Sequence, residues 1–172
     1  MPDVQTALHT HHQAVDAFLT AARAVPVARW AEPRAPRKWS PGQVAEHLAI
    51  AYEVNRQVLR GTPPGPAAPR LLRPLIRRFL LGPVLRRGRF IPGSKSPAVF
   101  QPSASPASPA VLLSRLESAA GAFERDAAAA RAPDIDHPFF GRLPIVAFVR
   151  LQEIHTRHHH GQILPAPYLT KS

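Results

Sequence analysis

The chain of 172 residues contains no cysteine, one methionine and two tryptophans. The absence of cysteine excludes disulfide bonds, thiolate metal ligands and a cysteine nucleophile, so any bound metal must be held by nitrogen and oxygen atoms. No uninterrupted apolar run approaches the roughly 18 residues needed to span a bilayer, and the first residues lack the basic and apolar parts of a secretory signal. We therefore expect no transmembrane segment and a cytoplasmic protein.

Acidic residues are absent from a long part of the chain: residues 54–116 hold eleven Arg or Lys and no Asp or Glu. The net charge of +11 comes wholly from this stretch, because the remaining residues balance at eleven basic against eleven acidic. A basic excess of this local origin is a weak argument for nucleic-acid binding. We expect no specific nucleic-acid partner.

The length fits a single domain, residues 1–172, with a hydrophobic core of its own. Residues 61–109 differ from the rest in being rich in proline, and we interpret them as an insertion or long loop. Within it, residues 71–81 predict a short amphipathic helix that begins no earlier than Arg73. This helix is either a solvated cover over the domain or a surface for an anion, a phosphate backbone or a membrane interface.

The arginines of that short helix carry a separate prediction. We expect the charges of Arg73, Arg77 and Arg78 to stay solvated, because runs of like charge usually serve solvation. They should then matter more for anionic ligands than for folding.

Apolar residues recur at helical spacing in four long segments. The segments run over residues 3–25, with Asp3 as a candidate N-cap, from Ser40 to about residue 58, from Ser108 to before Pro133, and from Pro144 onward. The link at residues 134–141 is rich in aromatic residues and proline, so we expect an ordered loop whose phenylalanines enter the core. The pattern predicts an all-α protein.

The second helix has the most specific start. Ser40 is a candidate N-cap, followed by Pro41 at the first helical position and Gln43 at the third, which is the pattern of a capping box. Trp39 and Val44 also match a hydrophobic staple. The sequence therefore specifies closely where this helix begins.

Histidine is the most informative residue type, since four of the nine histidines fall between positions 155 and 160. His155 and His159 stand four residues apart, which places both rings on one face of a helix. The pair is either half of a metal site or a solvated basic helix end. His47 lies within the apolar stripe of the second helix, and a buried histidine needs partners for its ring nitrogens.

His47, His155 and His159 together form a set of three nitrogen ligands that leaves coordination positions open, as in catalytic metal sites. Imidazole nitrogen suits Zn, Ni, Fe, Co or Cu and disfavours Mg and Ca. Thr156 follows His155, so the general base of HExxH peptidases is absent. His11 lies on the stripe of the first helix, and we expect it at the edge of that stripe, outside the site.

Three motifs carry a resemblance to a known family: residues 39–48 (WSPGQVAEHL), residues 137–143 (HPFFGRL) and residues 155–163 (HTRHHHGQI). In this order they resemble the DinB-like superfamily of four-helix metalloproteins, in particular a poorly characterised branch, over nearly the whole chain. The resemblance implies an up-down-down-up four-helix bundle with the insertion, residues 61–109, between helices 2 and 3.

The resemblance also assigns residues. It maps the metal ligands onto His47, His155 and His159, and it matches Gln162 to a polar position that often follows the second histidine of the pair. Gln162 is therefore a candidate for orienting a ligand or the substrate. His160 departs from the family pattern, which usually has an apolar residue there.

Superfamily members with assigned roles include thiol-dependent S-transferases and isomerases. We therefore expect a metal-dependent enzyme that acts on a small-molecule substrate as a transferase, isomerase or hydrolase, with a divalent transition metal and a low-molecular-weight thiol as candidate cofactors. The alternative is a non-catalytic, metal-stabilised binding protein whose Arg-rich insertion contacts an anionic partner. A pocket of about 300 Å³ or more at the ion would favour the enzyme. A homodimer is compatible with the sequence.

Overall fold

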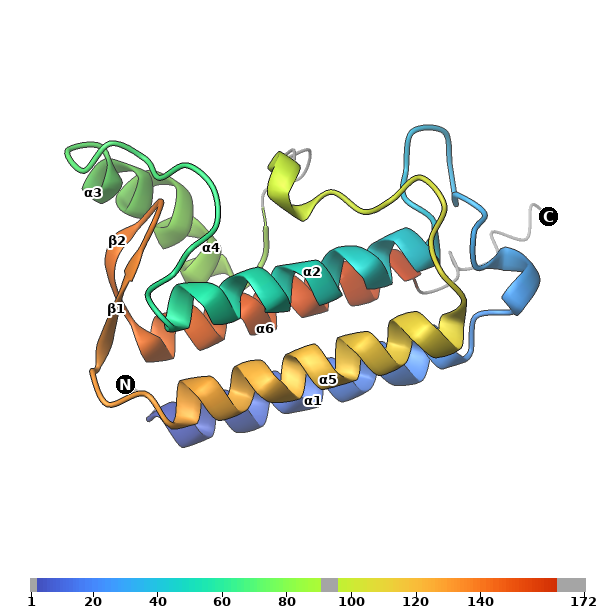
Figure 1. Ribbon diagram of the computed structural model, residues 1–172, viewed down its shortest axis with the longest axis horizontal. Helices are drawn as coiled ribbons and strands as arrows, with labels where there is room; N and C mark the ends of the chain where they lie inside the picture. Colours follow the sequence, from blue (N-terminus) through green and yellow to red (C-terminus); the bar gives the residue numbers. More distant parts are fainter. Residues whose placement is uncertain (1–2, 91–95, 164–172) are drawn as a thin grey trace.

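The computed structural model describes residues 3–90 and 96–163. Four long helices form most of the structure: α1 (Val4–Arg23), α2 (Pro41–Leu59), α5 (Pro109–Ala128) and α6 (Ile145–Ile163). The largest contacts join α2 to α5 and α1 to α6, and smaller ones join α1 to α5 and α2 to α6. Figure 1 shows α1 and α6 running in one direction and α2 and α5 in the opposite one. The core therefore lies between these four helices.

The remaining elements are short: η1 (Val27–Arg29), α3 (Arg73–Ile76), η2 (Arg77–Leu81), α4 (Gly82–Arg87), η3 (Ala98–Phe100), β1 (Asp134–His137) and β2 (Gly141–Pro144). The prediction of a mostly helical chain is confirmed, but the predicted loop at residues 134–141 is wrong, because β1 and β2 pair as an antiparallel hairpin. Gly141 has φ +67 where the turn closes, a conformation that glycine adopts without strain. Phe139 and Phe140 lie in the turn and are only half-buried: Phe140 packs against the core, so the prediction that both enter it holds only in part.

The predicted caps hold the first two long helices. The Asp3 side chain accepts a hydrogen bond from the Thr6 amide at 2.7 Å. Ser40 and Gln43 exchange the two hydrogen bonds of a capping box, at 3.0 and 3.2 Å. A Cβ at Gly42 would lie 2.7 Å from Trp30 Nε1 and 2.8 Å from the Pro106 ring, so the start of α2 requires glycine for close packing.

The core contains a polar chain that the sequence did not predict. His11 is fully buried instead of lying at the edge of its stripe. Its Nδ1 lies 2.8 Å from Glu124 Oε1 and its Nε2 2.9 Å from the Tyr52 hydroxyl, which contacts Thr156. We call Thr156, Tyr52, His11 and Glu124 the histidine relay. It joins all four long helices, because each contributes one member.

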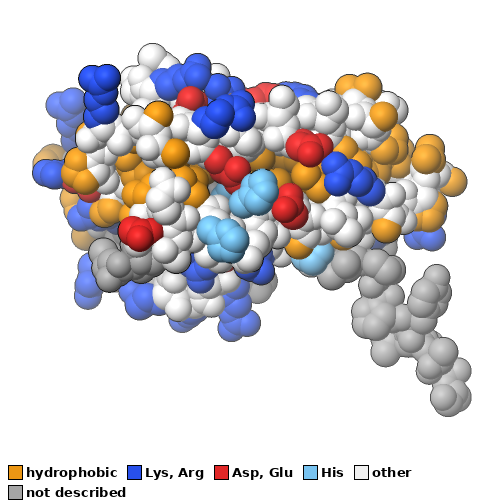
Figure 2. Space-filling view, turned by 90° about the horizontal axis from the view of Figure 1, so that it is seen from below, with side chains coloured by type: hydrophobic (Ala, Val, Ile, Leu, Met, Phe, Trp, Pro, Cys, Tyr) orange, Lys and Arg blue, Asp and Glu red, His pale blue; other side chains and the backbone are white. Residues whose placement is uncertain are grey.

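The carboxylate end of the relay reaches the surface on the side of α1 and α5. His12, which is exposed, lies 3.2 Å from Glu124 and 3.5 Å from Asp16. Figure 2 shows histidine and acidic side chains gathered near the middle of this face. Burial raises the pKa of Glu124, but the hydrogen bonds from His11 and His12 outweigh burial and leave this pKa below its usual value.

The insertion forms a continuous helical segment, residues 73–87, which we call the insertion helix. This helix is longer than predicted. A π-helical turn at Arg77–Leu81 precedes Pro83 and accommodates its ring and its lack of an N–H donor, so the helix continues to Arg87. Leu81 and Val84 are buried, and α4 contacts α6. Among the described residues, no helix is both long and apolar enough to cross a membrane.

Two of the insertion arginines contribute to the fold: Arg77 stays exposed as predicted, whereas Arg73 is partly withdrawn from solvent, contrary to the prediction. Arg73 is half-buried and pairs with Asp136 at 3.2 Å, and it donates to the Ala68 carbonyl. Arg77 donates to the Arg142 carbonyl. Both arginines therefore fasten the insertion helix to the β hairpin, because the hairpin offers acceptors that the sequence did not reveal.

Candidate metal centre

The structure brings the three predicted histidines together where α2 begins and α6 ends. The Nε2 atom of His155 lies 3.1 Å from Nε2 of His47 and 3.1 Å from Nε2 of His159. Ligand atoms of all three lie within 4.8 Å of one another, and two of the three residues are buried. Metal–nitrogen bonds of about 2.0–2.1 Å at roughly 90–110° would separate nitrogen atoms by about 2.9–3.4 Å. We call these residues the histidine triad.

Hydrogen bonds on the outer side of the triad fix the protons. His47 Nδ1 lies 2.7 Å from the Phe100 carbonyl, which can only accept, so this nitrogen carries the proton. His159 Nδ1 donates to Gln162 Oε1 at 2.9 Å, and the Gln162 amide donates to His158. Because a neutral imidazole has one proton, Nε2 of His47 and of His159 presents a lone pair to His155.

This proton arrangement decides whether the residues fit a metal ion. His155 Nε2 can carry one proton and therefore satisfies at most one of the two lone pairs that face it. A cation among the three Nε2 atoms would satisfy all of them, while the outer hydrogen bonds would hold the ring orientations, as they do in metal sites generally. The donor set therefore fits a divalent transition metal.

The surroundings keep these histidines neutral. Burial lowers the pKa of His47, and it lowers the pKa of His155 and of His159 well below the usual value. The neighbouring imidazoles lower the last two further. The Trp39 ring lies 4.7 Å from that of His47, and the Phe90 ring lies 5.4 Å from that of His155. Neutral imidazole is the form that binds metal, so little proton competition is expected near neutral pH.

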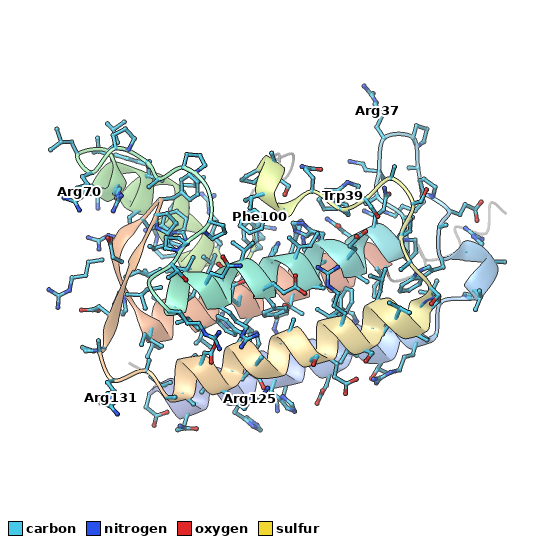
Figure 3. The ribbon with its side chains drawn as sticks, in the orientation of Figure 1. Arg37, Trp39, Arg70, Phe100, Arg125 and Arg131 are labelled. Carbon is cyan, nitrogen blue, oxygen red and sulfur yellow. The ribbon has the colours of Figure 1, made fainter. Side chains whose placement is uncertain are left out.

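The end of the insertion carries the acceptor for His47. Glu46 accepts hydrogen bonds from the Ser103 amide and hydroxyl at 3.1 and 2.7 Å, and Gln43 donates to the Ser103 carbonyl at 3.1 Å. These bonds fasten the segment after η3 to α2, and Figure 3 shows Phe100 and Trp39 over the same side of α2. The capping residue Gln43 thus also supports the acceptor of a candidate ligand.

A cavity of about 880 Å³ begins at the triad and extends between α2 and α6 toward the β hairpin and the insertion helix. Its far end is lined by apolar and aromatic side chains that include Ile76, Leu80, Phe139 and Phe140. The described lining contains no Asp or Glu. A space of this size beside a metal triad is large enough for a small organic molecule.

Polar groups enter the cavity at two levels. Asn55 and Gln152 are buried, and the Asn55 amide donates to Gln152 Oε1 at 3.0 Å. Nearer the triad, Arg34 donates to the Gln162 carbonyl at 3.2 Å, and Lys38 also lines the cavity. The cavity therefore offers cations close to the histidines and a neutral amide pair farther along.

A comparison with protein families fits this geometry. A sequence profile described as the DinB superfamily matches residues 10–163. The chain belongs to the DinB superfamily. The matched range includes the triad, Gln162 and the whole insertion. No curated protein and no solved structure matches the chain significantly.

The other histidines lie outside the triad. His158 is exposed and bonds Gln162, and His137 lies in the hairpin at another part of the cavity wall. His160, whose register departs from the family pattern, is not among the converging residues. The sequence analysis missed Asn55, although its position eight residues after His47 places it on a similar face of α2.

Proposed function

We propose that the protein is a metal-dependent enzyme that holds one divalent transition metal ion on His47, His155 and His159. The observation that carries this proposal is the convergence of three Nε2 atoms beside an open cavity. A metal held there would supply a Lewis acid that lowers the pKa of a coordinated thiol or water. We also assign the four helices to the up-down-down-up bundle of the superfamily, on the basis of their directions in Figure 1.

The chain's own residues would bind and orient the substrate. The apolar end of the cavity favours a substrate with an apolar or aromatic body, and the Asn55–Gln152 pair would fix a polar group on it. Arg34 and Lys38 would attract a carboxylate, which small thiols such as glutathione carry. These features support a thiol-dependent transferase or isomerase over a hydrolase.

A thermal-shift experiment tests the proposal. Zinc-, nickel- and cobalt-loaded protein is mixed with glutathione, mycothiol, bacillithiol or coenzyme A, and a ligand at 100 times its dissociation constant should stabilise the fold by about 2.7 kcal/mol. S-methylglutathione, which has no free thiol, is the matched control for glutathione. The His155→Ala variant should not respond to any thiol.

Activity measurements complete the test. Fully loaded protein should transfer the stabilising thiol to a generic small electrophile or isomerise a suitable substrate. No thermal shift with any thiol, together with no turnover of electrophiles or esters, would contradict the enzyme hypothesis. That result would favour a metal-stabilised binding protein whose Arg-rich insertion contacts an anionic partner.

A further inference from the structure

The outer side of the insertion exposes an unusual amount of apolar surface. Eight large apolar side chains are exposed among the described residues, and five of them belong to one stretch: Leu71, Leu72, Leu75, Phe79 and Leu80. Leu71 is 91% and Phe79 is 69% exposed. Leu72, Leu75 and Phe79 follow helical spacing, so they form a row along one side. Contiguous exposed apolar surface of this kind usually marks an interaction site.

Cationic side chains flank this row along the chain, and the guanidinium of Arg78 lies 5.9 Å from the centre of the Phe79 ring. Arg70, Arg78, Arg86 and Arg87 are exposed, and no ion pair between described residues involves them. Figure 3 shows Arg70 at the outer end of the insertion, away from the four long helices. No Asp or Glu occurs in residues 54–116 to balance these charges. The surface therefore combines apolar side chains with a positive charge of its own.

The insertion helix is also held firmly from its inner side. Leu81 and Val84 are buried, and Arg73 and Arg77 bond the β hairpin. The outer row is therefore presented by an anchored element whose inner face is already occupied. An occupant of the outer row must come from outside the described fold.

We propose that this surface, Arg70 to Arg87, binds an anionic lipid membrane. The apolar row would enter the boundary between headgroups and acyl chains, and the arginines would contact the anionic headgroups. A second copy of the chain fits less well, because a symmetric contact through this surface would bring the same arginines together without an acidic partner in the stretch.

Docking would also place the cavity near the membrane. Ile76 and Leu80 line the apolar end of the cavity, and they belong to the same element as the exposed row. A lipophilic substrate could then pass from the lipid to the cavity. This consequence for the substrate rests on the proposed function, whereas lipid docking does not require a metal.

Vesicle sedimentation tests the proposal with the full chain. The protein should bind vesicles of mixed phosphatidylglycerol and phosphatidylcholine and bind pure phosphatidylcholine much more weakly. Phe79→Ser and Leu75→Ser should each weaken binding roughly tenfold or more, since each removes a large apolar side chain from the contact. Raising the salt concentration should weaken the electrostatic part.

Matched controls separate docking from folding. Val27→Ser and Val111→Ser change side chains that are 76% and 59% exposed elsewhere, and they should bind vesicles like the wild type. Unfolding temperatures of all four variants should agree. The His47→Ala variant should also bind vesicles normally, so failure of the metal hypothesis and failure of docking are distinguishable.

Three outcomes would overturn the proposal: no binding to anionic vesicles, equal loss in the control and row variants, or binding that ignores lipid charge. A dimer that sediments at twice the mass and dissociates in Phe79→Ser would identify a second copy as the occupant. If the protein bound no vesicles but formed a complex with an acidic soluble protein through the row, that protein and not the lipid would be the occupant.

Discussion

The structure buries histidine in two different ways within the same four helices. In the histidine relay, His11 has a separate partner for each ring nitrogen, Glu124 on one side and Tyr52 on the other. In the histidine triad, the outer nitrogens of His47 and His159 bond Phe100 and Gln162, while the inner nitrogens face His155. Both groups contain buried histidines, but they differ in which ring nitrogens carry protons and in what those nitrogens face.

The proton directions of the relay can be followed from its carboxylate. Ionised Glu124 can only accept, so His11 donates from Nδ1 and accepts at Nε2 from the Tyr52 hydroxyl. Tyr52 can then accept from Thr156, and burial raises the pKa of the Tyr52 phenol, which keeps its proton. Every member of the relay is satisfied without an ion. The comparison shows that burial of a histidine does not by itself indicate a metal site. The indication in the triad is that ring nitrogens without a proton face one another.

The largest expected effect concerns metal affinity in the triad. His47→Ala, His155→Ala and His159→Ala should each weaken zinc binding by at least about a hundredfold, because each removes one of three nitrogen ligands. Isothermal titration calorimetry, with zinc added to chelator-treated protein, measures the affinity. His11→Ala, His9→Ala and His158→Ala are the controls and should keep affinity within a few-fold; equal losses in both sets would indicate surface chelation.

Substitutions in the relay should lower the free energy of unfolding and leave metal affinity nearly unchanged. His11→Ala should cost roughly 2–4 kcal/mol, because it leaves Glu124 and Tyr52 without a buried partner. In metal-free protein His155→Ala should cost much less, since His155 Nε2 satisfies at most one of the two lone pairs that face it. Urea unfolding compares the two variants, and equal costs would remove the distinction between relay and triad.

His137 is a third buried histidine, and its protonation should change the stability of the fold. Burial lowers its pKa to about 4, the nearby Asp136 opposes this change and Arg73 adds to it. In the unfolded chain His137 binds a proton below about pH 6.5, whereas in the folded chain it does so only near pH 4. The free energy of unfolding should therefore decrease by roughly 3 kcal/mol as the pH falls from about 6.5 to about 4. His137→Gln should flatten the curve of unfolding free energy against pH in this range. An unchanged slope would mean that this residue is not kept neutral.

The smallest effect should come from the group that orients a ligand. Gln162→Ala removes the acceptor of His159 and should weaken zinc affinity by about 10–100-fold, less than loss of the histidine itself. Gln162→Glu keeps an acceptor and should restore most of the affinity. Wild-type zinc affinity in Gln162→Ala would show that Gln162 does not orient His159.

The sequence predicted those features that depend on neighbours along the chain. Asp3 and Ser40 cap the expected helices, and the apolar stripes face the core, so His47, His155 and His159 could be placed on inner faces. These features arise from local periodicity and capping, which a sequence records directly. The pairing of His155 and His159 was predictable because they share one helix face, whereas the approach of His47 to this pair was implied by the resemblance to the family.

Features that depend on distant partners were not predictable. The members of the histidine relay are separated by up to 145 positions, between His11 and Thr156, and no local pattern links them. The Phe100 carbonyl is a backbone atom without a sequence signature. The exposed row at Leu75 and Phe79 has the same periodicity as a core stripe, and only packing decides which side meets solvent.

Elemental analysis of untagged protein, purified without chelator, tests the histidine triad most directly. We predict about one divalent transition metal ion per chain in the wild type and in His11→Ala, and background metal in His155→Ala. Background metal in the wild type that persists after reconstitution with zinc, nickel, cobalt, iron and copper would contradict the account.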